Sequence, residues 1–164
     1  MEIIVKKNKL NFLGHTYNCA IGKNGTTANK IEGDGKTPLG CFTFSKIYYR
    51  KEKIPALKFG LDSEIINHES GWCDDPKSEF YNSFVKLPIN VSAEKLLRDD
   101  DLYDLIFVIN YNSDPVIRNK GSAIFMHIAK PNYDATEGCI ALIKNDLIAI
   151  SEQISPATKI LIED

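Results

Sequence analysis

A histidine and a cysteine twelve residues apart, His127 and Cys139, are the pair in this sequence whose types and spacing suit covalent chemistry. His127 stands near the end of an apolar run that is typical of a buried strand, and Cys139 follows Gly138 just before a second apolar run. A thiolate attacks a carbonyl carbon and a thiol does not, so a cysteine nucleophile needs a base within hydrogen-bond reach. The pattern predicts Cys139 as nucleophile and His127 as base. An inert core cysteine beside a buried strand histidine fits the same spacing.

The glycine before the cysteine has a predicted role of its own. Gly138 has no Cβ, so the backbone there can approach a substrate closely. We expect the N–H groups of Gly138 and Cys139 to point at the oxyanion that develops on the attacked carbonyl. Pairing with an imidazole further predicts a thiol pKa below its ordinary value of about 8.5. Cys73, with His68 nearby, is the weaker candidate nucleophile because no further motif supports it.

Two segments of the chain carry a recognisable pattern when they are taken together. One is His127 followed by Thr136-Glu137-Gly138-Cys139-Ile140, and the other, upstream, reads GDGKTPLGCF over residues 33–42. In this order they resemble the motifs of the YkuD-type L,D-transpeptidases, and the resemblance covers most of the chain. Glu137 stands where many members of that family have histidine, and Ala141 stands where most have arginine.

The resemblance implies an acyltransferase that acts on the stem peptides of peptidoglycan, in cell-wall biogenesis and cell shape. Cys139 would attack the carbonyl after the third residue of a tetrapeptide donor, release D-alanine and pass the acyl group to an amine acceptor. A backbone carbonyl, by position that of Ile128 or a neighbour, would orient the His127 ring. Hydrolysis of the same thioester would make the chain an L,D-carboxypeptidase, and a chain without turnover would be a cell-wall peptide-binding module. The sequence leaves these alternatives open.

Further residues are predicted to contact the substrate. Thr136 and Glu137 precede the Gly-Cys pair in the same loop. Trp72 and Tyr81 flank a polar segment that resembles one branch of the family found in proteobacteria. Their amphipathic rings predict a substrate-binding rim. The alternative is a structured loop whose tryptophan covers the core.

A cation is also expected at the site, because Ala141 replaces the arginine of most relatives. Arg118 and Lys130 flank the strand of His127 and are the candidates. We favour Arg118, since a guanidinium can grip a carboxylate with two parallel hydrogen bonds. A solvated surface charge is the more common alternative for either residue.

Composition limits the remaining functions. The 164 residues predict one domain, residues 1–164, with a hydrophobic core. A formal net charge of −2 and the absence of a dense basic block predict no nucleic-acid binding. The cysteines are widely spaced without a CxxC pair, so neither a metal site nor a cofactor is predicted. If one of the four is catalytic, three remain, which disfavours a complete disulfide framework but leaves one bridge open.

The expected location follows from the substrate that the resemblance implies. Peptidoglycan lies outside the cytoplasmic membrane, so the periplasm or cell envelope is expected. The chain shows no basic segment followed by an apolar one, as a secretion signal would, and the cytoplasm stays open as an alternative. No run approaches the roughly 20 apolar residues of a membrane span. The sequence gives no indication of the oligomeric state.

The predicted elements are mostly strands. Strands are expected over Glu2–Lys6, Leu10–Leu13, Thr16–Ile21, Leu39–Tyr49, Leu102–Tyr111, the run before His127, and Ala157–Glu163. Helices are expected over Ser92–Arg98, with Ser92 as N-cap, and Lys144–Gln153. The fold class is therefore mostly β, a sandwich or mixed barrel with one or two short helices and a cleft at one edge.

Overall fold

The strands form one large sheet and two small ones in a computed structural model that describes every residue from Met1 to Asp164. The strands, in chain order, are β1 (Glu2–Lys6), β2 (Lys9–Phe12), β3 (His15–Asn18), β4 (Thr26–Thr27), β5 (Thr37–Pro38), β6 (Gly40–Tyr49), β7 (Ser63–Ile65), β8 (Ser70–Cys73), β9 (Phe84–Lys86), β10 (Ala93–Lys95), β11 (Leu105–Ile109), β12 (Phe125–Ile128), β13 (Ile140–Leu142) and β14 (Lys159–Glu163). The only helix, α1 (Lys144–Ser151), lies between β13 and β14.

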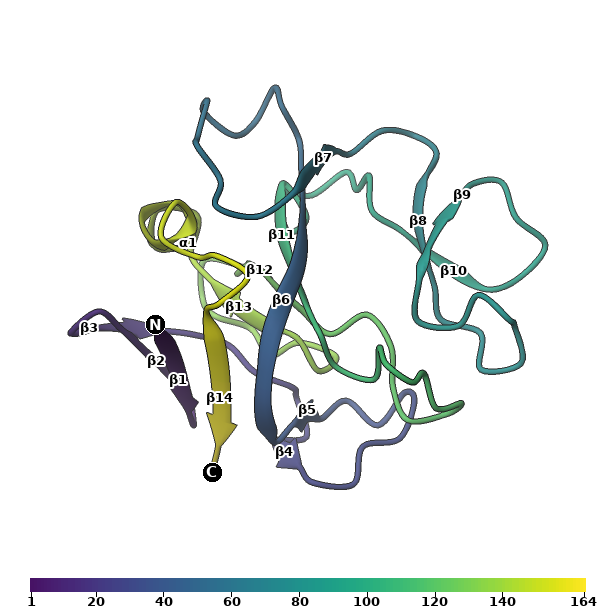
Figure 1. Ribbon diagram of the computed structural model, residues 1–164, viewed down its shortest axis with the longest axis horizontal. Helices are drawn as coiled ribbons and strands as arrows, with labels where there is room; N and C mark the ends of the chain where they lie inside the picture. The colour runs from purple at the N-terminus through teal and green to yellow at the C-terminus, as the bar shows by residue number, and fades with distance from the viewer.

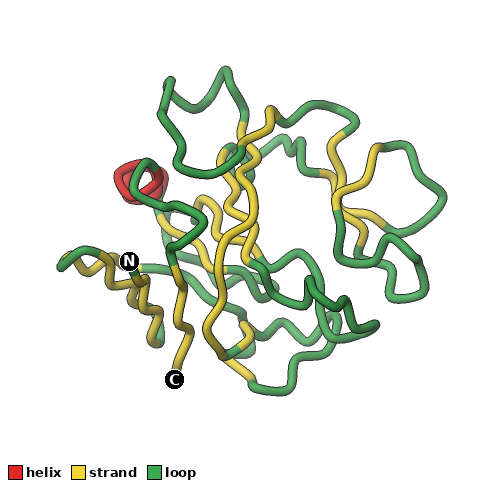
Figure 2. The backbone as a smooth tube through the Cα atoms, viewed as in Figure 1, coloured by secondary structure: helices red, strands yellow, loops and turns green.

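The large sheet curls until its two ends meet. Its strand order is β13-β12-β11-β6-β14-β1-β2-β3, with β7 beside β6 (Figure 1). Just after β3, Ala20 pairs with Ala141 of β13 through two backbone hydrogen bonds of 2.8 and 3.0 Å. The sheet is thus a nearly closed barrel. Figure 2 shows that the chain has many strands and a single helix. The predicted fold class is confirmed.

Both faces of the central strands are buried, against different clusters. Leu105 and Phe107 of β11 point into the larger core, whereas Ile106 and Val108, which alternate with them, point into a second cluster. A strand that is apolar on both faces reads as a continuous apolar run, which is why β11 was predictable. The larger core lies inside the curled sheet and under α1, which buries Leu147.

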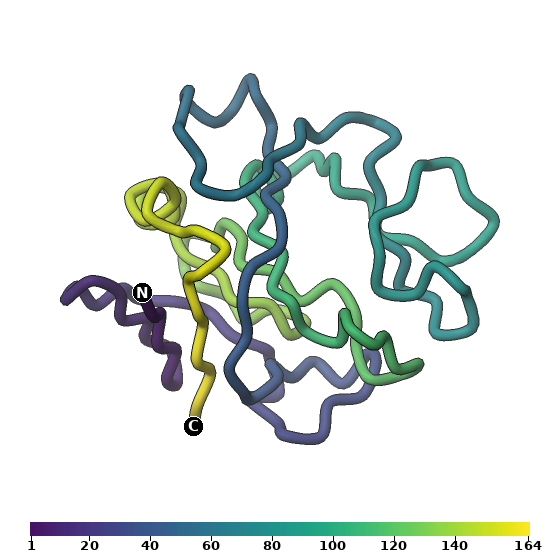
Figure 3. The backbone as a smooth tube through the Cα atoms, in the orientation of Figure 1, coloured from purple at the N-terminus to yellow at the C-terminus, as the bar shows by residue number.

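The second cluster lies between the large sheet and a three-stranded sheet of β8, β9 and β10, which we call the capping sheet. Figure 1 shows the capping sheet beside β6 and β11, and Figure 3 shows that one continuous stretch of the middle of the chain forms it. The Trp72 ring of β8 meets the Phe125 ring of β12 edge to face at 5.1 Å. The cap therefore packs directly on the strand that carries His127.

One predicted helix is wrong. Residues predicted as the helix Ser92–Arg98 contain β10, which pairs antiparallel with β8. Leu96 is completely buried in the second cluster and donates its N–H to the Ser70 carbonyl. The local helix preference of these residues is overridden by strand pairing and side-chain burial, and both depend on β8, which is distant in the sequence.

The C-terminal segment agrees with its prediction. Helix α1 begins at Lys144 as expected and ends at Ser151, two residues before the predicted end. No helix of the chain combines the length and the apolar character needed to cross a membrane. β14 then pairs in parallel with β1, so the two ends of the chain share the sheet (Figure 1).

Candidate active site

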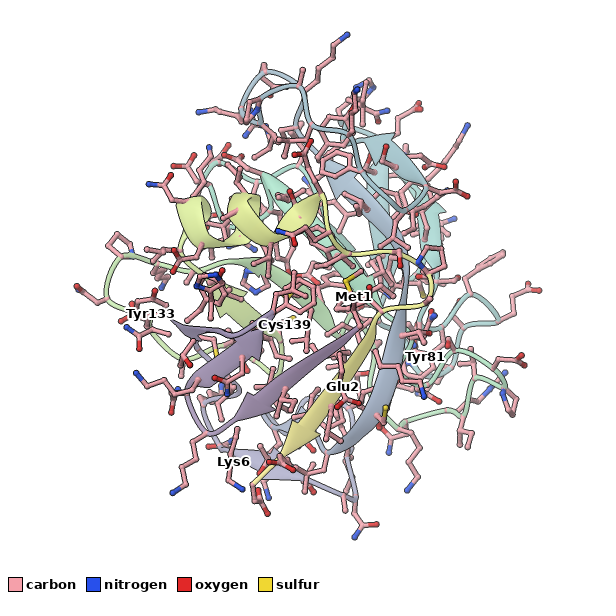
Figure 4. The ribbon with its side chains drawn as sticks, turned by 60° about the vertical axis from the view of Figure 1, so that its left-hand side comes forward. Met1, Glu2, Lys6, Tyr81, Tyr133 and Cys139 are labelled. Carbon is pink, nitrogen blue, oxygen red and sulfur yellow. The ribbon has the colours of Figure 1, made fainter.

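His127 and Cys139 are brought together by the parallel pairing of β12 with β13. In that register His127 is opposite Ala141, and Cys139 comes level with Phe125. Side chains alternate along a strand, so His127 and Phe125 lie on one face of β12, the face that the capping sheet covers. Both His127 and Cys139 line one cavity of about 310 Å³. Figure 4 places Cys139 in the interior of the molecule, with Lys6 and Tyr133 at its periphery.

The Cys139 thiol lies between two backbone groups at the start of β12, one from Phe125 and one from Ala123 just before the strand. Its Sγ donates to the Ala123 carbonyl at 3.2 Å and accepts the Phe125 N–H at 3.4 Å. Ala123 has a φ of 53°, a conformation that residues with a Cβ seldom adopt, and it aims this carbonyl at the sulfur. The thiol is therefore held by the backbone in a fixed position.

Burial governs the ionisation of both residues. Burial raises the pKa of the Cys139 thiol to about 12, although the Phe125 N–H acts in the opposite direction. Burial lowers the pKa of His127 to about 4 against the opposing effect of the Ile128 carbonyl. The expected thiol pKa below 8.5 is wrong, because desolvation of the thiolate outweighs the hydrogen bond from the Phe125 N–H. At pH 7 the Cys139 thiol and the His127 imidazole are therefore both neutral.

The tautomer of His127 follows from its hydrogen bond. Nδ1 lies 2.8 Å from the Ile128 carbonyl oxygen, which can only accept, so Nδ1 carries the proton. Nε2 is then the nitrogen that can accept a proton from a thiol. The Ile128 carbonyl thus makes the contact that its predicted role toward the ring requires. The Tyr103 ring adds a second constraint, with its centroid 5.2 Å from that of the imidazole at an angle of 75°.

Thr136 organises the loop that presents the nucleophile. Its hydroxyl donates to the Cys139 carbonyl at 2.7 Å and accepts the Gly138 N–H at 3.1 Å. The Thr136 N–H is itself bonded to the Ile21 carbonyl at 2.9 Å, which ties the loop to the first part of the chain. The predicted role of the Gly138 N–H toward an oxyanion does not fit this arrangement, since that N–H is used inside the loop. The Cys139 N–H makes no hydrogen bond within the chain.

Gly138 is required by its neighbours. Its φ is +139°, and a Cβ added there would lie 2.8 Å from the Lys36 carbonyl oxygen. Lys36 belongs to the second recognised motif, residues 33–42, which therefore packs directly on the nucleophile loop. That motif is braced by Asp34, which accepts the Lys36 N–H at 2.9 Å and the buried Lys30 ammonium at 2.6 Å. Lys30 was not predicted, since an isolated lysine in a glycine-rich segment reads as a solvated charge.

Trp72 and Tyr81 do not form a substrate rim. Trp72 is only 8% exposed and Tyr81 only 3% exposed, and neither residue lines the cavity of His127 and Cys139. Trp72 belongs to the second cluster, and the Tyr81 hydroxyl donates to Glu32 and accepts the Gly121 N–H at 2.9 Å. Neither ring therefore stands at a rim of that cavity, because both side chains are held in the interior by these contacts.

Asn82, which was not a predicted site residue, connects the capping sheet to the segment that leads into β12. Its Oδ1 accepts the Trp72 indole N–H and the Ala123 N–H, each at 3.0 Å. Its Nδ2 donates to the carbonyls of Tyr111 and Asn112 at 3.0 and 2.8 Å. One amide thus satisfies four groups and holds the residue whose carbonyl binds the thiol.

Asn82→Ala is expected to destabilise the protein by about 3 kcal/mol, because two donors and two acceptors lose their partner. The φ of 56° at this position adds to the cost. The measurement is the free energy of unfolding from urea denaturation. Asn119→Ala is the matched control, since Asn119 is exposed, has a φ of 65° and makes no side-chain hydrogen bond. A loss equal to that of the control would show that the Asn82 bonds contribute nothing.

The predicted cation is in the wrong place. Arg118 is exposed on the loop before β12 and does not line the cavity. Lys130 does line it, and so does Arg98, which was not among the predicted site residues. The Arg98 guanidinium binds Asp100 through two hydrogen bonds of 2.8 and 2.7 Å. Ala141 packs against Ala20 and Ala129 and brings no charge to the cavity that it lines.

The remaining members of the cavity complete the site. The lining residues are Glu94, Arg98, Asp100, Leu102, Tyr103, His127, Ala129, Lys130, Asp134, Ala135, Thr136, Glu137, Cys139 and Ala141. Glu137 is an exposed member whose carboxylate pairs with Lys23 at 2.8 Å. No three His, Cys, Asp or Glu side chains are arranged to hold a metal ion. All four cysteines are free thiols. The cavity can support attack by a thiol with an imidazole as proton acceptor, at a carbonyl that enters it.

Comparison with known proteins identifies one family over nearly the whole chain. The family model that matches is described as L,D-transpeptidase catalytic domain, of the YkuD type, and covers residues 3–162. None of the curated proteins matches the chain. Among solved structures, that of Bd1075 from Bdellovibrio bacteriovorus is similar, with 21% sequence identity and a TM-score of 0.48. The match covers 99% of this chain and 47% of that one, so the chain spans about half the length of Bd1075.

Proposed function

We propose that this chain is a cysteine-dependent L,D-transpeptidase acting on peptidoglycan stem peptides. The chain belongs to the L,D-transpeptidase catalytic domain family, which supports the proposal. The observation that carries the proposal is the arrangement of His127 and Cys139 in one cavity. The imidazole is neutral, its Nδ1 proton is bound by the Ile128 carbonyl, and its Nε2 is the basic nitrogen. A base in this state can accept a proton from the thiol at the moment of attack.

The proposed reaction begins at the carbonyl of the third residue of a tetrapeptide donor. The Cys139 Sγ forms a bond to the carbonyl carbon while its proton passes to Nε2 of His127. The peptide bond to D-alanine then breaks, and the imidazolium gives that proton to the departing amine. An amine acceptor attacks the resulting thioester, the new amide forms, and the thiol is restored. Because thiol and imidazole are both neutral beforehand, proton transfer accompanies the attack and is not completed before it.

The Cys139 N–H is the proposed donor to the oxyanion, because it is unused within the chain, whereas the Gly138 N–H is bonded to Thr136. Rearrangement of the loop on substrate binding would free the second N–H. A substrate located in the cell wall also places the proposed activity in the periplasm or cell envelope.

Incubation with a purified tetrapeptide muropeptide, followed by mass spectrometry, tests the proposal. A cross-linked dimer with loss of one D-alanine is the expected product, together with an acyl adduct on the peptide that contains Cys139. Tripeptide without dimer would make the protein an L,D-carboxypeptidase, because water would then resolve the thioester. Unchanged substrate without any adduct would contradict the proposed chemistry and leave a binding module.

A further inference from the structure

One acidic side chain in the catalytic cavity lacks a cationic partner. Six charged residues line the cavity, and four of them are acids. Three acids form salt bridges: Asp100 with Arg98, Asp134 with Lys130 and Glu137 with Lys23. The fourth, Glu94 on β10, forms none, and its one hydrogen-bond partner is the Tyr103 hydroxyl at 2.6 Å.

Tyr103 connects Glu94 to the catalytic pair. The same ring that donates to Glu94 packs against the His127 imidazole, with the Arg98 guanidinium 5.0 Å from its centroid. The Arg98 guanidinium is directed at Asp100 through two hydrogen bonds, from Nε and Nη2, and forms no salt bridge with Glu94. The unpaired carboxylate is therefore held in place beside the reacting groups.

The charge of Glu94 opposes the nucleophile of its own site. Burial is the main cause of the raised pKa of Cys139, and the negative charge of Glu94 adds to it. Burial likewise raises the pKa of Glu94, while the Tyr103 hydroxyl and Arg98 act in the other direction. Burying an ionised carboxylate costs free energy unless a cation pairs with it, and here the carboxylate also disfavours formation of the thiolate.

We propose that Glu94 binds a primary ammonium group of the substrate, which supplies the cationic partner that the chain itself lacks. The ammonium would also neutralise the charge that opposes ionisation of Cys139, so that binding of the correct substrate favours the attack. The proposed ammonium site is inferred from the cavity and its charges. Only the identity of the molecule that carries the ammonium rests on the proposed function. That source is either the side chain of a diamino third residue of the donor or the amine of the acceptor.

Charge-selective labelling of Cys139 tests the site without any need for turnover. The probes are the 2-aminoethyl, 2-hydroxyethyl and 2-sulfonatoethyl methanethiosulfonates, which are cationic, neutral and anionic. In each case Sγ forms a disulfide with the reagent's alkylthio group, and methanesulfinate leaves. The background is Cys41→Ser, because Cys41 is the exposed cysteine, and peptide mapping follows Cys139.

The measured quantity is the rate ratio of the cationic to the neutral reagent. Glu94→Gln is expected to lower this ratio about tenfold, because the negative charge that attracts the cationic reagent is lost. The rate ratio of the anionic to the neutral reagent should rise for the same reason. Glutamine keeps the shape and can still accept the Tyr103 O–H, and equal thermal unfolding temperatures verify the fold. Asp134→Asn is the matched control, since Asp134 lines the same cavity but is exposed and paired, and its ratio should stay within about twofold.

Equal ratios in Glu94→Gln and in the unmodified protein would overturn the proposal, and so would an equal change in Asp134→Asn. The source of the ammonium is found with donor tetrapeptides whose third-residue side-chain amine is free or acetylated. If the donor supplies the ammonium, Glu94→Gln raises KM about tenfold for the free amine and leaves KM for the acetylated donor unchanged. If the acceptor supplies it, only the acceptor KM rises. No product from the unmodified protein would contradict the proposed function, and the labelling ratios would still decide the role of Glu94.

Discussion

Cys139→Ala is expected to lower kcat/KM for a tetrapeptide donor at least about 10⁴-fold, because no other group in the cavity can form the thioester. The fold should survive, since the substitution removes one sulfur atom that makes two weak hydrogen bonds to the backbone. The measurement is D-alanine release, with the free energy of unfolding measured beside it.

Cys73→Ala is the matched control for the nucleophile. Cys73 is also a buried free thiol, on β8 of the capping sheet, and it does not line the cavity. Its loss should lower stability by about 1 kcal/mol and leave kcat within about twofold. Turnover that survives in Cys139→Ala but disappears in Cys73→Ala would move the active site to the capping sheet.

His127→Gln is expected to lower kcat about 10³-fold, because an amide cannot accept the thiol proton. His15→Gln, at an exposed position on β3, should leave kcat unchanged. Steady-state kinetics with the same donor supply both values. Equal rates for the two variants would mean that the thiol loses its proton to some other group.

The same variant has a second effect, on the pH dependence of stability. The pKa of His127 is about 4 in the folded protein and about 6.5 when unfolded, so the unfolded state takes up a proton first. The stabilising contribution is complete above pH 6.5 and is lost as the pH falls toward 4, by about 3 kcal/mol in total. Urea denaturation across this range should show a flatter profile for His127→Gln than for His15→Gln. Parallel profiles would mean that the imidazole is not buried in its neutral form.

Alternation within single strands made much of the large sheet predictable. β1 has the predicted bounds, and β6 differs from its prediction by one residue, because their own side chains decide which face is buried. The prediction of His127 and Cys139 as a pair rests on two motifs, the second over residues 33–42, in the family's order, and the structure brings both residues to one cavity. The contact of His127 with the Ile128 carbonyl could be expected from their adjacent positions. All of these depend on residues that are close together in the sequence.

The features that were wrong or missed depend on contacts across the fold. Whether Ser92–Arg98 forms a helix is decided by β8, and whether Trp72 is a rim or a core residue is decided by Phe125. The pKa of the Cys139 thiol depends on how completely the capping sheet excludes water from it. The residues around Cys139 in the sequence do not predict that burial. Nothing in the local sequence distinguishes Arg98 from Arg118. The path of the chain places Arg98 at the cavity and leaves Arg118 exposed to solvent.

The pairing of Ala20 with Ala141 also restricts how a peptide can be recognised. Without it, β13 would present a free edge of N–H and C=O groups immediately after the nucleophile, and an extended peptide could add there as one more strand. The two hydrogen bonds to Ala20 occupy that edge. A substrate therefore cannot be read through main-chain pairing on β13. Under the proposed function, recognition would therefore rest on the charged and polar groups that a stem peptide carries into the cavity, and discrimination between stem peptides should follow their side-chain chemistry rather than pairing along β13.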